Sequence, residues 1–346
     1  MMNSESFKWS VLLQNIDNMS IKTLQYTPMG YGSIPENRKI QEYIKNGAIN
    51  LDKPCNPSSH EVVTWIKNIL NVEKTGHSGT LDPSVSGCLI VCIDKATRLV
   101  KSQQSDGKEY VCVIQFHTET TEKEFKKVLK KLTGNLFQRP PLMCAVKRNL
   151  RLRNIYKTEF IDFDKENKKG LFKVSCEAGT YIRTFCVHVG LLLGCGAHML
   201  ELRRTKSGLL NESTCVTLHD LKDAMHVFKK TGEEKYIRKV IFPLENLLIK
   251  YPRILVKDSC VGSICHGAQL TLPGVLRFDN NIEIGTDVVI ITTKGEAVAL
   301  AISTMSSPEI HIANHGVVCK TKRVIMDKST YPSLWGNKDD VFMLFN

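Results

Sequence analysis

The sequence places one carboxylate, Asp82, in a short segment rich in glycine, residues 76–88 (GHSGTLDPSVSGC). Pro83 follows it directly, and a residue before proline is confined to extended backbone conformations, so the backbone of Asp82 is restricted. The glycines allow a sharp turn or the close approach of a ligand to the backbone. A carboxylate on such a turn is placed to act on a ligand. The alternative is that Asp82 only caps a turn, as aspartate commonly does.

The residues around Asp82 resemble a known family. The pattern GHSGTLDPxxxGCL is similar to the active-site motif of TruB-type pseudouridine synthases. The longer stretch 74–110 is similar to one branch of that family, the dyskerin-like catalytic subunits of box H/ACA ribonucleoproteins, and the likeness runs from about residue 20 to about residue 337. The resemblance implies an isomerase that breaks the N1–C1′ bond of a uridine, turns the uracil and rejoins it through C5.

An isomerase of this kind needs a carboxylate near the sugar, an aromatic platform for the base and a pocket that excludes water. By motif position the carboxylate is Asp82. The segment 179–183 (GTYIR) matches the family motif whose arginine pairs with that aspartate, and a carboxylate in a dry pocket is costly without a cation. The resemblance implies no cofactor and no metal, and it assigns the residues as follows: Asp82, Arg183 and Tyr181 are catalytic, and Tyr110, His77, Leu202, Gly79 and Thr80 bind the substrate.

Several of these residues also have a plainer interpretation. Tyr110 lies in a strand-like run with valines and would be a core tyrosine without the resemblance. A single loop histidine such as His77 is common. Arg183 at the start of a helix is unfavourable beside the positive end of the helix dipole, which favours a specific acidic partner. The Asp82 loop, GTYIR and LRRT (residues 202–205), in this order, make a strong constellation, whereas each alone is modest.

The composition limits the class of protein. The chain has 346 residues, 42% of them hydrophobic, which suggests two domains or one large domain with an appendage. Its net charge of +12 and pI near 9.1 favour a polyanionic partner such as RNA. The twelve cysteines include no C-x-x-C pair, so zinc-binding spacings are absent. Without an apolar signal segment or an apolar stretch of about 18 residues, we expect a protein of the cytosol or nucleus that contacts no membrane.

Hydrophobic periodicity predicts the elements that hold the site. Ser58 and Glu61 have capping-box spacing ahead of a helix that ends near Asn71 and delivers the chain into the Asp82 loop. Thr180 is expected to cap a second helix, whose inner face includes Phe185. We also expect a helix that begins near residue 121, carries five solvated lysines and is ended by Gly134, and strands at 49–53, 89–93, 110–116 and 171–177.

Residues 145–156 (AVKRNLRLRNIY) alternate as a strand with one basic face does. Lys147, Asn149, Arg151 and Arg153 fall on one side, and apolar residues fall on the other. Such a face suits the phosphate backbone of RNA, although charged residues also protect exposed edge strands. We expect this segment to bind RNA through Lys147, Arg148, Arg151 and Arg153.

Short strands and frequent turns prevail after about residue 252, and residues 288–292 and 297–305 flank a turn typical of a hairpin. This segment resembles the PUA domain, a small RNA-binding β-barrel. We therefore expect an α+β fold with four parts. These are an N-terminal extension at 1–50 that packs on the PUA domain, a catalytic domain at 51–250 with a mixed, mainly antiparallel sheet and flanking helices, an all-β PUA barrel at 251–337, and a tail at 338–346.

The resemblance favours guided modification, because about 50 residues precede Lys53 and a PUA-like segment follows the catalytic part. It implies uridine isomerisation in rRNA and other RNAs, directed by a box H/ACA guide RNA and supported by small companion proteins. It also implies a role in ribosome biogenesis in the nucleus and nucleolus. Two alternatives stay open: a stand-alone tRNA pseudouridine synthase, and a non-catalytic scaffold that stabilises guide RNAs.

Overall fold

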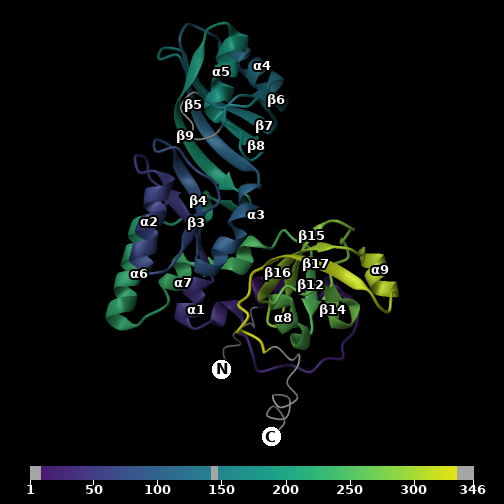
Figure 1. Cartoon of the computed structure of the whole chain (residues 1–346). Coiled ribbons are helices and arrows are strands. Elements are labelled where there is room, and N and C mark those ends of the chain that lie inside the picture. The colour runs from purple at the N-terminus through teal and green to yellow at the C-terminus, as the bar shows by residue number, and fades with distance from the viewer. Residues whose placement is uncertain (1–8, 142–146, 333–346) are drawn as a thin grey trace, which may run out of the picture. The chain divides into compact units, whose positions relative to one another are not determined.

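The structure, a computed structural model, describes residues 9–141 and 147–332 (Figure 1). The chain forms two compact units. Unit 1 comprises Met1–Ala48, Ile93–Leu99 and Ile241–Asn346, and unit 2 comprises Ile49–Cys92 and Val100–Val240. Unit 2 contains both the Asp82 loop and the GTYIR segment, so it carries the candidate site.

Unit 2 is built on a mixed sheet. Its strands are β2 (Gly47–Lys53), β3 (Thr75–His77), β4 (Ser86–Ile93), β5 (Lys108–Phe116), β6 (Gly134–Gln138), β7 (Arg151–Asp164), β8 (Lys169–Cys176), β9 (Ala197–Ser207), β10 (Leu210–Asn211) and β11 (Phe242–Pro243). Five residues of these strands fall in unit 1: Gly47, Ala48, Ile93, Phe242 and Pro243. The order is β11-β2-β4-β9-β5-β8-β7-β6, while β3 pairs with β4 and β10 with β9. β4 and β9 run parallel, and the pairs from β9 through β5, β8 and β7 to β6 are antiparallel. The predicted mixed, mainly antiparallel sheet is confirmed.

Helices cover this sheet in two groups. They are α2 (Ser59–Leu70), α3 (Val100–Gln104), α4 (Glu122–Lys131), α5 (Ile182–Leu193), α6 (Leu218–Thr231) and α7 (Ile237–Val240). α2 and α6 pack together at one end of the sheet, and α4 and α5 pack together at the other (Figure 1). Phe125 of α4 and Phe185 of α5 are fully buried, and both rings contact the ring of Phe172 on β8. Burial of these aromatic faces fixes α5 on the sheet.

The structure confirms most of the elements expected in unit 2 and corrects three. α4 ends at Lys131, and Gly134 is the first residue of β6, so Gly134 does not end the helix. The capping box of Ser58 and Glu61 is present at the start of α2. Thr180, however, does not cap α5: the N-cap residue is Tyr181, and the Thr180 hydroxyl donates to the Glu177 carbonyl oxygen within the preceding turn. The local sequence contains a residue suited to capping, but the turn after β8 uses its hydroxyl instead.

The predicted basic strand begins later than expected. β7 starts at Arg151, and residues 147–150 form neither helix nor strand. Arg148 donates from Nε to the Pro140 carbonyl oxygen at 3.1 Å, so its guanidinium holds the loop instead of standing on a strand face. The first residues of the prediction, 145–146, lie outside the described residues.

Unit 1 contains a sheet of strands β1 (Ser20–Ile21), β12 (Arg253–Val256), β13 (Leu270–Thr271), β14 (Val275–Phe278), β15 (Asp287–Ile291), β16 (Ala297–Ser303) and β17 (Val317–Val324). Their order is β1-β14-β12-β15-β16-β17-β13, and β12 with β15 is the parallel pair among the pairings of this described sheet. The predicted hairpin is β15–β16. Besides α1 (Ile40–Lys45), this unit has α8 (Asp258–Cys265) and α9 (Ser307–Ile312), helices that the sequence analysis did not anticipate.

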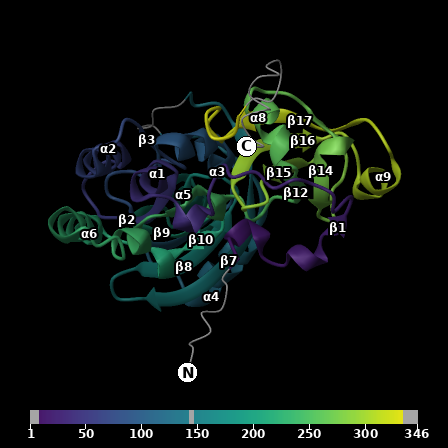
Figure 2. The same cartoon turned by 90° about the horizontal axis from the view of Figure 1, so that it is seen from below.

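The N-terminal segment is hydrogen-bonded to this sheet. β1 pairs with β14 at its outer edge, where the purple segment of Figure 2 reaches β14. Arg253 donates from Nη1 to the carbonyl oxygens of Leu12 and Gln14 at 3.0 and 2.7 Å. The segment therefore completes the edge of the sheet.

Candidate active site

The Asp82 loop is fixed from α2. Ser59, the first residue of α2, is buried, and its hydroxyl both accepts a hydrogen bond from the Leu81 N–H at 2.8 Å and donates one to the Leu81 carbonyl oxygen at 2.9 Å. The Leu81 side chain is itself buried. The residue before Asp82 is thus held by both backbone groups and by its side chain, so the carboxylate projects from a fixed point.

A buried lysine is hydrogen-bonded to the same loop. Lys53 is fully buried, and its ammonium donates to the carbonyl oxygens of Pro54, Pro57 and Pro83 at 2.7, 2.8 and 3.1 Å. Burial lowers the pKa of Lys53. Three acceptors offset the cost of taking an ammonium out of water. Lys53 therefore joins the end of β2 to the turn that follows Asp82.

Asp82 and Arg183 form the ion pair that the sequence analysis expected. Arg183 Nη2 lies 3.0 Å from Asp82 Oδ2, and the two side chains are 32% and 43% exposed. Arg183 is the second residue of α5, where the helix dipole disfavours a cation, and the carboxylate of Asp82 offsets that effect. Because the guanidinium is planar and forked, the contact also orients the carboxylate.

Both tyrosines of the expected site face the same cavity. Tyr181 lies at the N-cap of α5, and Tyr110 lies on β5, almost completely buried. Burial raises the pKa of Tyr110, an effect that the nearby Arg204 opposes. Tyr110 therefore stays a neutral phenol near pH 7, with its ring available as an apolar surface.

The cavity between these residues has a volume of about 550 Å³, within the range of small-ligand sites. Seven of the eight predicted catalytic and substrate-binding residues line it: Gly79, Thr80, Asp82, Tyr110, Tyr181, Arg183 and Leu202. His77 does not line it; it lies on β3, and burial lowers its pKa. The lining carries the cations Lys108, Arg183 and Arg204 against the single carboxylate of Asp82. This excess of positive charge suits an anionic ligand such as a phosphodiester.

Lys108 and Arg204 are lining residues that the sequence analysis missed. Arg204 is 1% exposed, and it donates from Nε to the Cys88 carbonyl oxygen at 2.6 Å and from Nη2 to the Gly79 carbonyl oxygen at 3.3 Å. Lys108 is also buried and donates to two carbonyl oxygens, those of Gln103 and Asp106. Arg204 lies in the LRRT motif, but its burial depends on the pairing of β9 with β4 and could not be predicted from neighbouring residues.

Within the described residues, no group of three or more histidine, cysteine or acidic side chains is arranged to hold a metal ion. In the same part of the chain, no helix is long and apolar enough to cross a membrane.

Family models match nearly the whole chain. They are the DKCLD (NUC011) domain at residues 6–63, the TruB family pseudouridylate synthase (N terminal domain) at 67–182, the tRNA pseudouridylate synthase B C-terminal domain at 183–249 and the PUA domain at 252–325. The H/ACA ribonucleoprotein complex subunit CBF5 of Emericella nidulans is 57% identical over 337 residues, which cover 96% of this chain and 70% of that protein. This chain belongs to the dyskerin/Cbf5 family.

Solved structures of the dyskerin/Cbf5 family agree with the fold. The structure of an H/ACA RNP bound to a substrate RNA containing 2′-deoxyuridine matches with a TM-score of 0.83 at 43% identity, over 92% of this chain and 97% of that one. A Cbf5-Nop10-Gar1 complex matches with a TM-score of 0.83 at 45% identity, over 91% and 96%. The chain spans about two thirds of the length of the first two curated relatives that it matches.

The four residues expected to bind RNA have different surroundings in this dyskerin/Cbf5-family chain. Lys147 and Arg148 are exposed, and Arg151 is half-buried opposite Gln138 on β6. Arg153 is 17% exposed; its Nη1 lies 3.4 Å from Glu177 Oε1, and its Nε donates to the Gly179 carbonyl oxygen. None of the four lines the cavity of Asp82. Arg153 holds the turn that leads to Tyr181, whereas Lys147 and Arg148 are exposed to solvent, with Arg148 also bound to the Pro140 carbonyl oxygen.

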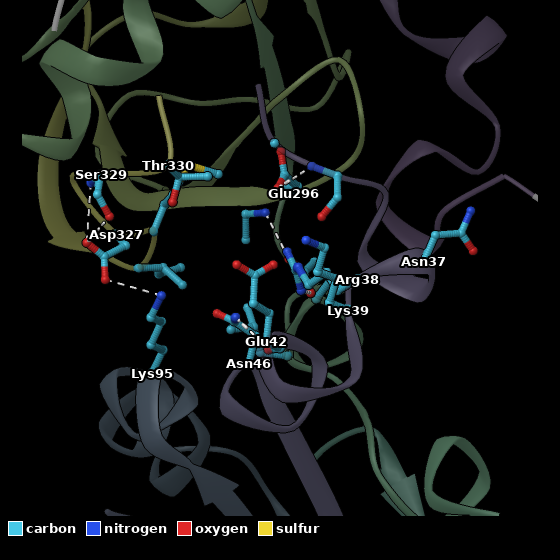
Figure 3. A pocket seen from close by; sticks show the side chains of 17 residues that line it. Asn37, Arg38, Lys39, Glu42, Asn46, Lys95, Glu296, Asp327, Ser329 and Thr330 are labelled. Carbon is cyan, nitrogen blue, oxygen red and sulfur yellow. Dashed lines mark hydrogen bonds and ion pairs between the residues drawn. The ribbon is translucent and has the colours of Figure 1, made fainter. Parts of the chain in front are cut away.

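Unit 1 has a second, polar cavity of about 530 Å³, shown in Figure 3. Arg38 donates to both carboxylate oxygens of the buried Glu245, at 3.0 and 2.7 Å, and Glu245 also accepts from the Ala297 N–H. Glu296 accepts from the Ser33 N–H at 3.0 Å. Arg38 and Ser33 thus connect the N-terminal segment of this chain, through Glu245 and Glu296, to the start of β16.

Proposed function

We propose that this chain isomerises uridine to pseudouridine in RNA, as the catalytic subunit of an H/ACA ribonucleoprotein that takes its target from a guide RNA. The observation that supports this most is the Asp82–Arg183 ion pair at 3.0 Å, which opens on a cavity lined by Tyr110, Tyr181 and Leu202. The cavity is large enough for one nucleotide, and a uridine stacked in folded RNA must be flipped out to reach it.

The reaction defines what each side chain has to do. The N1–C1′ bond breaks, the uracil turns, the C5–C1′ bond forms, the proton on C5 leaves and N1 gains a proton. In this proposal Asp82 acts on the ribose, as nucleophile at C1′ or as base toward a ribose proton. Arg183 orients it, and the Tyr181 hydroxyl serves proton transfer at the base. Tyr110 stacks on the uracil, and Leu202 forms an apolar wall that keeps water from the detached base.

The rest of the proposal concerns the RNA and the partners. Gly79 and Thr80 border the flipped nucleotide, and His77 fills space behind it. Lys147, Arg148, Arg151 and Arg153 are assigned to RNA contacts, the first two by their exposure. We assign residues 51–250 to catalysis, 251–337 to guide-RNA binding as a PUA domain and 1–50 to an extension on that domain. The solved relatives bind a substrate RNA and form a complex with Nop10 and Gar1, and we propose that this chain likewise binds guide RNA, substrate rRNA and small companion proteins, in the nucleus and nucleolus.

The test is a reconstituted assay with tritium at C5 of the target uridine, whose release reports isomerisation. The chain is combined with an H/ACA guide RNA, a complementary target and the companion proteins, with Asp82→Asn in parallel. Release that needs both the guide and Asp82 is the expected result. Release from a tRNA without guide would replace the proposal by a stand-alone enzyme. Tight guide binding with no release under any condition would replace it by a scaffold.

A further inference from the structure

Gln138, the last residue of the edge strand β6, makes two hydrogen bonds to one residue of the site. Its Oε1 accepts from the Tyr181 N–H at 3.0 Å, and its Nε2 donates to the Tyr181 carbonyl oxygen at 3.3 Å. The side chain is 1% exposed, so water does not compete for either bond. The amide therefore binds both backbone polar groups of Tyr181, its N–H and its carbonyl oxygen.

These two hydrogen bonds lie at the start of α5. Tyr181 is the N-cap residue of α5, and no side-chain cap of its own satisfies the helix start. Arg139 directly follows β6, and its carbonyl oxygen accepts a hydrogen bond from the Thr184 hydroxyl at 3.1 Å, in the first turn of the helix. Two consecutive residues of the edge segment are thus bound to the first turn of α5, and that turn carries both Tyr181 and Arg183.

We propose that Gln138 is a positioning residue for the reaction: by its two hydrogen bonds it sets the place of the Tyr181 hydroxyl in the cavity and aims Arg183 at Asp82. The inference rests on the proposed function for its effect on catalysis, but the positioning itself is a property of the fold.

The chemistry of the side chain explains why an amide is needed. Only a group that donates and accepts at once can serve both the N–H and the carbonyl oxygen of Tyr181. Leucine has neither function. Glutamate has both while it is protonated, but its ionised form accepts only and sets a negative charge against the Tyr181 carbonyl oxygen. Burial shifts a carboxyl group toward its neutral form, so the glutamate variant is expected to switch within an accessible pH range.

The experiment compares Gln138→Leu and Gln138→Glu with the unchanged chain in the assembled ribonucleoprotein. The control is Gln115→Leu, which also removes an amide that donates to backbone carbonyl oxygens, those of Phe116, Asn167 and Lys168, at a position that does not line the cavity. We expect Gln138→Leu to lower kcat by about 10²-fold, the scale of a misplaced reacting group, with KM for RNA unchanged. Gln138→Glu should approach the unchanged chain at low pH and fall away from it as pH rises. Gln115→Leu should keep kcat.

A second measurement does not depend on activity. Amide exchange at Tyr181 should be accelerated by Gln138→Leu and not by Gln115→Leu. Thermal unfolding curves check that both variants are folded at the temperature of the assay. An unchanged kcat of folded Gln138→Leu, or a Gln138→Glu activity ratio that does not vary with pH, would overturn the catalytic part. Unchanged exchange at Tyr181 would overturn the positioning itself. If the unchanged chain released no tritium, the proposed function would fail, and the exchange result alone would then decide whether Gln138 positions Tyr181.

Discussion

Arg183 reaches Asp82 from the second position of α5, with Nη2 at 3.0 Å from Oδ2. Asp82 lies in the loop between β3 and β4, and Arg183 lies at the start of a helix. The contact therefore depends on how the sheet places these two segments. The two side chains are 32% and 43% exposed, and an ion pair so open to solvent contributes little to stability. Its value therefore lies in orientation.

Replacement of Arg183 by lysine should separate these two effects. Lysine keeps the charge but loses the planar fork, so we expect kcat to fall by about 10²-fold while the free energy of unfolding changes by less than about 1 kcal/mol. The measurements are single-turnover tritium release and urea denaturation. Arg203→Lys is the matched control, since Arg203 pairs with Asp52 at 2.9 Å with similar exposure and does not line the cavity. Equal kcat values for the two variants would contradict the prediction.

Neighbouring serines at the start of α2 offer a second contrast. Ser59→Ala removes both bonds to Leu81 and should cost about 1–3 kcal/mol. Ser58→Ala removes the helix cap and should cost about 1 kcal/mol. Because only Ser59 holds the residue before Asp82, only its loss should also lower kcat in folded protein. A proportional loss of kcat in both variants would show that helix stability, and not loop fixation, governs the rate.

The buried pair of Arg38 and Glu245 predicts a large stability effect in unit 1. Arg38→Met leaves the Glu245 carboxylate buried without its cation and should cost about 3–5 kcal/mol. Lys95→Met breaks the more exposed contact with Asp327 and should cost at most about 1 kcal/mol. Amide exchange in β16, whose Ala297 N–H donates to Glu245, measures both. Similar protection in the two variants would refute the assignment.

Glu296 predicts a pH dependence of stability. It is 2% exposed, and burial raises its pKa above the ordinary value. The folded chain therefore holds this proton to higher pH than the unfolded chain does. The stabilisation is complete below the unfolded pKa of about 4.3 and is lost as pH rises through the raised folded pKa. Glu296→Gln should remove this loss, so the difference in unfolding free energy, unchanged chain minus variant, should decrease with rising pH. A difference that is constant or increases would contradict the prediction.

Two glycines of the Asp82 region should respond differently to alanine. Gly79 and Gly87 have φ of +135° and +102°, so each substitution carries backbone strain of about 1–3 kcal/mol. A Cβ at Gly79 would meet nothing nearer than 3.7 Å, whereas at Gly87 it would lie 2.2 Å from the Arg204 carbonyl oxygen. Gly87→Ala should thus cost clearly more than Gly79→Ala in urea denaturation, because β4 and β9 would have to separate. Equal midpoints would disprove this close approach.

Local signals in the sequence predicted what local physics determines. The capping box at Ser58, the strand at 110–116 and the β15–β16 hairpin depend on residues a few positions apart, and each is confirmed. The ion pair of Asp82 was predicted from motif resemblance. Features that depend on distant segments were missed: Thr180 does not cap α5, the Tyr181 N–H just before this helix is bound by Gln138 of β6, and Arg204 is buried because β9 pairs with β4.

The Lys53 ammonium lies inside the protein with three carbonyl acceptors, so an acylating reagent in solution cannot reach it while the loop is closed. Acylation at this position therefore requires the segments that carry Pro54, Pro57 and Pro83 to separate first. The rate of Lys53 acylation, relative to that of exposed lysines in the same sample, depends on how often the loop that carries Asp82 opens. Acylation of Lys53, measured by mass spectrometry without any substrate, therefore reports how often this loop opens.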